Sequence, residues 1–324
     1  MPEPLLSAPE PTELGSCRLT LNPSVRHLPG GVLLGGTPLR VLRLSQAGGD
    51  ALRELEAGQP AVGPRARLAR QLVDAGLARA DFQQTSFGLE DLTVVVPTRD
   101  RAEQVDQLLW RLSPARCLIV DDASAFPERL AQICAAHGAS VVRSASPLGP
   151  GAARNLGASK VSTPLIAFID SDVTCSAEDL GDLLSAFEDP KVAGVAPRVR
   201  GPRGERLLER FEHDASPLDM GTRRATVRPG TTVSYVPTAC LILRQELCVG
   251  LFDGSLLVGE DVDALWRIAE AGWAVQYEPE VEVEHPVRPS LRAWLAQRHL
   301  YGRSAADLAQ RHPEAIAPLR GSPQ

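Results

Sequence analysis

PLIAFIDSD, residues 164–172, joins an apolar run to two carboxylates. The run from Pro164 to Ile169 has the length of one buried strand. Asp170 and Asp172 follow it, and on a continuing strand their side chains would point to opposite faces, which would drive one of them into the core. We therefore expect the strand to end at Asp170 and the chain to turn. Both acids then lie at the carboxyl edge of the sheet, where ligands bind in open α/β folds.

The two carboxylates allow two interpretations. Hard oxygen ligands without a neighbouring Cys or His suit Mg²⁺ or Mn²⁺, which is usually shared with a diphosphate. The same Asp-Ser-Asp sequence is also typical of an ordinary turn, or of a cap for a helix that begins near Ala177. The surrounding chain has to decide between a metal site and a turn.

Strands and helices alternate around this stretch, as they do in parallel α/β sheets. The expected strands are 92–96, 117–120, 139–142 and 164–169, and the expected helices are 103–112, 126–137 and 149–158. Polar residues follow the first strand (97–101), the second (121–124) and the fourth (170–172). Three polar strand ends at one sheet edge define a cleft, and this favours the metal interpretation over the turn.

Composition limits the class of protein. The chain has 324 residues and a net charge of −6, which argues against nonspecific binding to nucleic acid or to an anionic membrane. Its six cysteines show no paired ligand spacing, so reduced buried thiols are the expectation. The first 15 residues lack the features of a signal peptide, and no apolar stretch approaches the roughly 20 residues that span a bilayer. We expect a cytoplasmic protein that is at most peripheral to a membrane.

Residues 1–91 differ in style from the rest. We expect a disordered leader (1–16), a small winged-helix-like α+β unit (17–82) and a short polar linker (83–91). In the small unit, alternating or glycine-bracketed segments predict strands at 18–21, 30–36 and 39–44. Ser45 predicts the start of a helix that stops at Gly58, and a second amphipathic helix spans 65–75. A structural cap on the next domain is an equally open role for this unit.

The second half is less regular. We expect a strand at 192–199, a flexible charged loop at 201–228 and a helix that opens at Glu260-Asp261 and ends at Gly272. Two short strands, 273–277 and 281–284, precede His285. The α/β domain would then cover 92–288, and a C-terminal helix and tail would cover 289–324.

Several motifs in this order resemble those of the inverting family 2 glycosyltransferases, which have the GT-A fold with a mostly parallel, Rossmann-like sheet. They are PTRDR (97–101), DDAS (121–124), GPGAARNLG (149–157), DSD (170–172), GED (259–261) and a later His285. The 17–82 unit resembles PqqD-like peptide-recognition domains. Together the two parts resemble the glycosyltransferases of mycofactocin biosynthesis.

The resemblance implies a UDP-sugar site at the strand ends. Asp122 would accept a hydrogen bond from the uracil, Asp170 would hold the ribose, and Asp172 with His285 would bind Mn²⁺ or Mg²⁺. Glycines before a helix also suit phosphate, whereas a glycine-rich helix entry with an exposed arginine is the structural alternative. The other residues implied to line the nucleotide-sugar site are Pro97, Thr98, Arg99, Gly149, Arg154, Asn155, Ser171 and Glu260.

Asp261 resembles the family's catalytic base, which takes the proton of the acceptor hydroxyl. An acidic pair at a helix start is also ordinary compensation of the helix dipole. On the acceptor side we expect Gln297 and Arg298, followed by Tyr301-Gly302-Arg303, although their spacing departs from the motif of processive relatives. Trp266 could stack on a sugar, but its helical spacing favours core packing.

The expected function is inverting, metal-dependent transfer of glucose from UDP-glucose, β-1,4-linked when a chain is elongated. The acceptor would be the peptide-derived cofactor mycofactocin or its precursor, and the small unit could hold a precursor peptide. Three alternatives remain open: another acceptor such as a polysaccharide or lipid-linked sugar, a sugar nucleotidyltransferase, and a non-catalytic peptide-binding module. A nucleotidyltransferase would carry a glycine-rich loop after the first strand, where PTRDR stands here.

Overall fold

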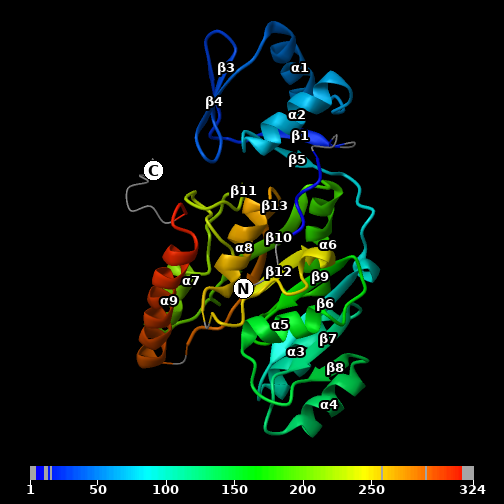
Figure 1. Cartoon of the computed structure of the whole chain (residues 1–324), viewed down its shortest axis with the longest axis vertical. Coiled ribbons are helices and arrows are strands. Elements are labelled where there is room, and N and C mark those ends of the chain that lie inside the picture. The colour runs from blue at the N-terminus through cyan, green and yellow to red at the C-terminus, as the bar shows by residue number, and fades with distance from the viewer. Residues whose placement is uncertain (1–4, 11–13, 15–16, 257, 289, 316–324) are drawn as a thin grey trace.

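An α/β domain and a smaller N-terminal unit make up the protein (Figure 1). The computed structural model describes residues 5–10, 14, 17–256, 258–288 and 290–315. Within these residues, the larger domain is built on one eight-stranded sheet with the order β11-β13-β10-β12-β9-β6-β7-β8. Its strands are β6 (Leu92–Thr98), β7 (Arg116–Asp121), β8 (Ser140–Arg143), β9 (Leu165–Ile169), β10 (Val192–Arg200), β11 (Ala225–Thr226), β12 (Cys240–Arg244) and β13 (Ala274–Glu284).

The first four strands of this sheet are parallel, as the alternating pattern predicts. They follow one another in the chain as β6, β7, β8 and β9, but their spatial order is β8-β7-β6-β9. The order therefore reverses between β6 and β9, and the carboxyl ends of these two strands form the kind of switch point where ligands bind. The later strand β12 runs antiparallel to β9 and β10, while β13 is parallel to β10.

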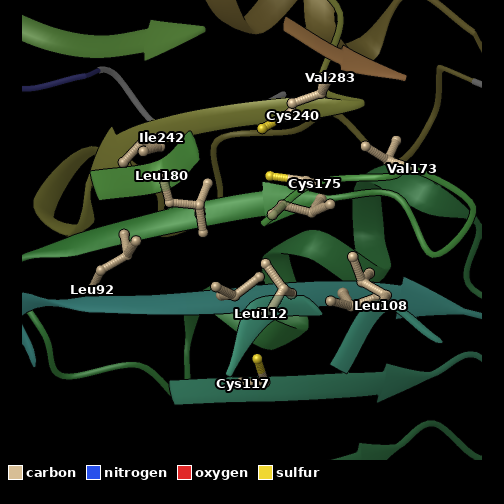
Figure 2. Close-up of a cluster of buried hydrophobic side chains, with 14 of the residues drawn as sticks. Leu92, Leu108, Leu112, Cys117, Val173, Cys175, Leu180, Cys240, Ile242 and Val283 are labelled. Atoms are coloured by element: carbon tan, nitrogen blue, oxygen red, sulfur yellow. The ribbon is translucent and has the colours of Figure 1, made fainter. Parts of the chain in front are cut away.

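Helices cover both faces of the sheet. One face packs against α3 (Ala102–Leu112), α4 (Pro127–Ala136) and α6 (Ala177–Leu183), and the other against α5 (Pro150–Ala158) and α8 (Glu260–Glu270). Alternate residues of one strand serve the two cores: Val94 and Val96 of β6 join the first, and Val95 joins the second. Figure 2 shows part of the first core, where leucines of α3 and α6 lie beside the strands. Burial on both faces explains why these strands are continuously apolar.

The N-terminal unit has a core of its own, formed by residues such as Leu33, Leu55 and Leu72. A two-stranded sheet pairs β1 (Arg18–Leu21) with β5 (Ala78–Asp81). A three-stranded antiparallel sheet joins β2 (Arg26–Leu28), β3 (Val32–Gly35) and β4 (Arg40–Arg43). The helices are α1 (Gln46–Glu56), which Ser45 caps as predicted, and α2 (Pro64–Asp74).

Buried charges fix this unit to the α/β domain. Arg70 of α2 donates two hydrogen bonds, of 2.8 and 2.9 Å, to the carboxylate of Asp189, and both side chains are buried. Lys191 pairs with Asp74 at 2.9 Å. Asp189 and Lys191 directly precede β10, so the unit docks near the amino end of that strand, away from the carboxyl edge of the sheet.

Three predicted segments differ from the structure. Within the expected disordered leader, residues 5–10 and 14 are ordered: the Ala8 amide donates to the Ala271 carbonyl at 3.0 Å, and Leu14 is buried in the N-terminal core. The rest of 1–16 lies outside the described residues. The expected flexible loop at 201–228 contains α7 (Leu207–Ala215) and β11. Helix α7 buries none of its residues, although Leu207, Leu208 and Phe211 have the spacing of one helix face and could have indicated it.

The two short strands expected before His285 are one strand, β13. Its register against β10 shifts between Glu278 and Glu282, and this irregularity accommodates Pro279, which has no backbone donor. The last helix, α9 (Leu291–Arg311), matches the prediction. No helix in the described part of the chain combines the length and the apolar composition that a bilayer-spanning segment requires. The six cysteines are buried and free, as expected.

Candidate active site

A pocket of about 750 Å³ opens at the carboxyl ends of β6 and β9, the switch point of the sheet. One wall comes from the strand ends and the start of α5, and the other from the start of α8 and from α9. Its lining residues are Pro97, Thr98, Arg99, Arg101, Asp122, Pro150, Ala153, Arg154, Asp170, Ser171, Asp172, Leu218, Pro237, Thr238, Ala239, Val258, Glu260, Asp261, His285, Arg288, Ala293, Ala296, Gln297, Leu300 and Tyr301.

Three potential metal ligands meet in this pocket. Asp170, Asp172 and His285 each offer one ligand atom, and these three atoms lie within 4.8 Å of one another. After β9 the chain turns, and the Val173 amide donates a hydrogen bond to the Asp170 carbonyl at 3.0 Å. Thr174 then forms an isolated bridge with Glu284, which brings His285 beside Asp172, and the two side chains are 3.7 Å apart. Two segments far apart in sequence therefore supply one cluster.

Arg101 also contacts this cluster, because its guanidinium donates to Asp172. Arg101 belongs to the PTRDR motif (97–101), and the resemblance assigns it no role. The turn that carries it is held by two left-handed residues, Asp100 (φ 55°) and Ala123 (φ 57°). The Asp100 amide donates to the Ser124 hydroxyl at 2.9 Å, and the Ala125 amide donates to the Asp100 carboxylate at 2.7 Å. These two hydrogen bonds hold the turns after β6 and β7 together. Such backbone strain is concentrated at functional sites.

Asp122 is buried and already holds a loop. Its Oδ1 accepts from the Leu148 amide at 2.6 Å and from Ser144 at 3.3 Å, and its Oδ2 accepts from the Gly149 amide at 3.0 Å. A carboxylate offers about four acceptor positions. One position on Oδ2 is therefore left for a donor in the pocket. Gly149 itself does not line the pocket but positions Pro150, which does.

Arg154 lies between the two walls. It is 3% exposed, and it donates to Asp170 at 2.7 Å and to Glu260 at 2.9 Å. Its guanidinium also lies 5.6 Å from the centre of the Phe252 ring. The alternative of an exposed arginine at a glycine-rich helix entry is therefore wrong. Arg154 links the end of β9 to the start of α8.

The start of α8 carries the two acids of the GED motif. Gly259 has a left-handed backbone (φ 87°), and Asp261 accepts from the Val262 amide at 2.8 Å. Burial raises the pKa of Asp261 above its ordinary value, and the positive charge of Arg154 opposes the rise. Burial and the neighbouring Asp261 also raise the pKa of Glu260. A half-buried carboxylate with a raised pKa that faces a pocket is a candidate proton acceptor.

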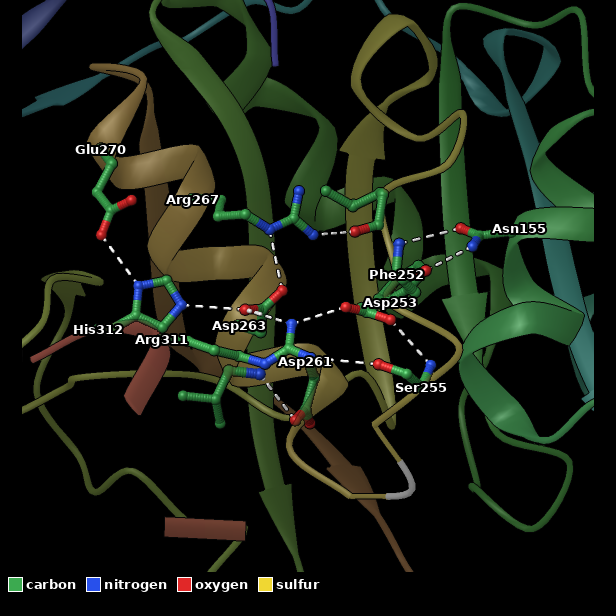
Figure 3. A network of polar contacts seen from close by, with 12 residues as sticks. Asn155, Phe252, Asp253, Ser255, Asp261, Asp263, Arg267, Glu270, Arg311 and His312 are labelled. Atoms are coloured by element: carbon green, nitrogen blue, oxygen red, sulfur yellow. Dashed lines mark hydrogen bonds and ion pairs between the residues drawn. The ribbon is translucent and has the colours of Figure 1, made fainter. Parts of the chain in front are cut away.

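A network of ion pairs and hydrogen bonds links α8 to the loop before it and to the end of α9 (Figure 3). Asp263 pairs with Arg267 at 2.9 Å and contacts His312, just beyond α9, at 3.0 Å. Arg311 of α9 donates to Asp253 at 2.7 Å. These contacts tie α9 to the helix that carries Asp261.

Some buried polar atoms of the pocket have no partner. Among the described residues, Thr98 Oγ1 and Arg154 Nε lack a hydrogen-bond partner. Unsatisfied buried polar atoms in native proteins usually indicate a missing ligand, ion or water. Both residues line the pocket, which fits a polar ligand there.

Four predicted residues lie outside the pocket lining. Asn155 donates to the Phe252 carbonyl at 2.7 Å and accepts from its amide at 3.0 Å, so it holds the loop before α8 onto α5. Trp266 is buried, and its indole donates to the Ser234 carbonyl at 2.7 Å, so it packs in the core, as its helical spacing favours, and not on the acceptor side of the pocket. Arg298 pairs with Glu212 at 2.7 Å. The fourth is Gly149, described above.

Three further pocket residues, Arg101, Thr238 and Arg288, had no role predicted from the sequence. Tyr301, which lies one helical turn from Gln297 in the segment predicted near the acceptor, lines the pocket. Thr238 and Arg288 lie in irregular segments, where the sequence carries no periodic signal.

Comparisons with known proteins identify the family and the fold that this chain resembles. Residues 93–250 match the family described as Glycosyl transferase family 2. Over 296 residues the chain is 42% identical to the Pre-mycofactocin glycosyltransferase of Mycobacterium tuberculosis (strain H37Rv), which covers 90% of this chain and 62% of that protein. It is also 27% identical over 224 residues to an uncharacterized glycosyltransferase of the same organism, which covers 62% of this chain and 91% of that protein. The resemblance predicted from the motifs is confirmed. The chain spans less than two thirds of the length of the 42% identical relative.

One solved structure supports the fold. The mannosyltransferase PcManGT from Pyrobaculum calidifontis, in complex with GDP-Man and Mn²⁺, superposes with a TM-score of 0.53 at 18% identity. The match covers 71% of this chain and 66% of that chain. The predicted GT-A-like fold is thereby confirmed.

Proposed function

Since residues 93–250 of this chain are those of a family 2 glycosyltransferase, we propose that it moves a sugar from a nucleotide-sugar donor to a hydroxyl group with inversion. The donor is UDP-glucose, and the acceptor is pre-mycofactocin, with β-1,4 linkage when further units are added. The mycofactocin assignment rests on the 42% identical relative, and the donor and linkage rest on the sequence resemblance. One observation carries the reaction type: a candidate metal cluster and a candidate base face one pocket at the switch point of the sheet.

The donor set fits a divalent cation. Two carboxylates and one imidazole suit Mn²⁺ or Mg²⁺, and Asp170, Asp172 and His285 present such atoms within 4.8 Å of one another. The solved mannosyltransferase is described with Mn²⁺ and a sugar nucleotide, which supports the same type of site here. A bound cation would neutralise charge on the departing nucleoside diphosphate. Arg101, which now pairs with Asp172, would add a second positive charge near that diphosphate.

The protein's own residues supply the rest of the reaction. Asp261 accepts the proton of the acceptor hydroxyl while the hydroxyl oxygen bonds to the anomeric carbon of the sugar. The bond from that carbon to the diphosphate oxygen breaks, and its electron pair leaves with the UDP. Arg154 pairs with Asp170 and with Glu260. It therefore fixes the position of the metal-binding carboxylates relative to Asp261, which follows Glu260. Thr98, with its unpartnered hydroxyl, and Asp122, with one open acceptor position, hold the nucleoside.

Calorimetry tests the donor site. UDP and GDP are titrated into the protein with and without MnCl₂, and we expect UDP to bind tightly only with metal. Asp172→Ala should weaken UDP binding at least tenfold in Mn²⁺, in line with the effects of disturbing a metal site. Asp182→Ala, an exposed carboxylate on α6, is the matched control and should leave the affinity unchanged. Equal UDP affinity for Asp172→Ala and the control would remove the metal site. Preference for GDP would remove uridine as the donor base.

A second role is proposed for residues 17–82. The unit has its own core, and its three-stranded sheet exposes Leu28 and Val41, with Leu39 exposed in the turn before β4. We propose that this face holds the precursor peptide. Val41→Glu should weaken binding of a fluorescent precursor peptide, measured by anisotropy, without changing UDP affinity. Undiminished peptide binding by that variant would exclude this surface.

A further inference from the structure

Helix α9 forms the wall of the pocket that faces the strand ends. Ala293, Ala296, Gln297, Leu300 and Tyr301 line the pocket. Their spacing of three or four residues places them on one face of the helix. Most of this wall is apolar, and Gln297 and Tyr301 are its polar side chains. A molecule bound against it therefore meets an apolar surface with two polar groups.

The two polar side chains form one unit. The Gln297 amide donates to the Tyr301 phenol oxygen at 2.8 Å. A phenol can accept and also donate one hydrogen. Among the described residues, the Tyr301 hydroxyl donates to no acceptor, so its hydrogen is available to the pocket.

The surroundings keep this hydroxyl a donor. Burial raises the pKa of Tyr301, and the carboxylates of Asp261 and Asp170 add to the rise, while Gln297 and Arg288 oppose it. The phenol therefore stays protonated near neutral pH. Asp261 and Asp170 line the same pocket as Tyr301.

We propose that Tyr301 is an acceptor-positioning residue: its hydroxyl donates a hydrogen bond to an oxygen of the acceptor next to the reacting hydroxyl, and Gln297 fixes the ring for this contact. The proposal rests on the proposed glycosyl transfer and extends it to acceptor selection. The favoured acceptor carries a hydroxyl or carbonyl oxygen beside an apolar face, which packs on Ala293, Ala296 and Leu300. An acceptor without that oxygen loses the selection that Tyr301 provides.

Tyr301→Phe removes only the hydroxyl, and two measurements read its effect. Calorimetry of pre-mycofactocin binding to the protein with UDP and Mn²⁺ should show affinity lowered about five- to tenfold, the usual effect of one lost hydrogen bond. The acceptor KM for glucosyl transfer should rise by a similar factor. UDP affinity and the slow release of UDP from UDP-glucose without acceptor should not change, because neither involves the acceptor.

Tyr235→Phe is the matched control. Tyr235 is also half-buried, but its hydroxyl donates to the Pro217 carbonyl at 3.2 Å and does not line the pocket. This variant should keep the affinity and the KM of the unchanged protein. Thermal unfolding of both variants checks that the ring still packs.

Each outcome decides one of the two proposals. Unchanged pre-mycofactocin affinity and KM in Tyr301→Phe would overturn the role of Tyr301 and leave the transferase standing. An equal loss of UDP affinity would also overturn it, because the hydroxyl would then serve the donor. If the unchanged protein neither binds UDP nor turns over UDP-glucose, the transferase itself fails, and the role of Tyr301 fails with it.

Discussion

The two walls of the pocket are built in different ways. On the strand wall, Thr98 is the last residue of a buried strand, Asp122 directly follows another, and Asp172 lies in the turn after a third. On the helix wall, Asp261 and Tyr301 depend on contacts between α8, α9 and distant loops. A strand end can be located from a few residues, whereas the position of a helix face depends on its partners.

This difference has a chemical counterpart. We propose that the strand wall binds the nucleotide. The helix wall carries the catalytic base, Asp261, and binds the acceptor. Arg154 connects the two walls through Asp170 and Glu260. Changes on the helix wall should therefore affect transfer and acceptor use, while donor binding stays with the strand wall.

The largest effect is expected for Asp261→Asn. The amide cannot take the proton of the acceptor hydroxyl, so the rate of transfer should fall about 10³-fold or more, as is typical for loss of a general base. UDP affinity should stay within about twofold, because the strand wall is intact. Single-turnover transfer of glucose to pre-mycofactocin and calorimetry with UDP and Mn²⁺ measure the two quantities.

Glu178→Gln, an exposed acid in the first turn of α6 and away from the pocket, is the control for this variant and should keep the rate. Transfer by Asp261→Asn at the control's rate would show that Asp261 is not the base. A parallel loss of UDP binding would break the division between the walls.

The next effect concerns the attachment of α9. His312→Ala removes the contacts of the ring with Asp263 at 3.0 Å and with Glu270 at 3.1 Å. The contact with the buried Asp263 contributes about 1.5–3 kcal/mol, and the contact with Glu270, which is 59% exposed, adds little, so the free energy of unfolding should fall by about 2–3 kcal/mol. A looser α9 should raise the acceptor KM severalfold and leave UDP affinity unchanged.

Denaturant unfolding with His137→Ala as control checks this prediction. His137 pairs with Asp106, which is about half exposed, so its loss should cost less than about 1 kcal/mol. Equal losses of stability in the two variants would show that the network of Figure 3 does not hold α9.

The strand wall could be predicted from the sequence, whereas most of the helix wall could not. The strands β6, β7 and β9 and their polar ends are evident from apolar runs that stop at acids, because both faces of these strands are buried. Helix α7 buries none of its residues and is held by Glu212, which contacts Trp294 and Arg298 of α9, so the apolar spacing of Leu207, Leu208 and Phe211 is its one sequence signal. Asp261 could be named only through resemblance. Its environment, including Arg154, comes from segments distant in sequence.

The pH dependence of transfer tests the link between the walls. Asp261 must be ionised to accept a proton, and its raised pKa means that it becomes protonated at a higher pH than an ordinary aspartate does. The rate should therefore fall about tenfold per pH unit below that raised value. The positive charge of Arg154 opposes the rise, so Arg154→Gln should move the acidic limb to higher pH.

Profiles of single-turnover rate against pH measure the limb, and Arg53→Gln, an exposed arginine of the N-terminal unit, serves as the control. A limb at the ordinary aspartate position, near pH 4, would contradict the burial of the base. A limb that stays in place in Arg154→Gln would contradict the electrostatic link.

The smallest effect is expected for Arg298→Ala, which separates the two residues predicted on the acceptor side. Gln297 lines the pocket, whereas Arg298 points to α7, where it pairs with Glu212 at 2.7 Å and lies 4.9 Å from the centre of the Trp294 ring. The pair is about one-third exposed on the arginine side, so its loss should lower the free energy of unfolding by less than about 1 kcal/mol. The acceptor KM should change less than about twofold, because the helix face towards the pocket is untouched. A tenfold rise in that KM would place Arg298 on the acceptor and would mean that the helix wall extends beyond the pocket as described.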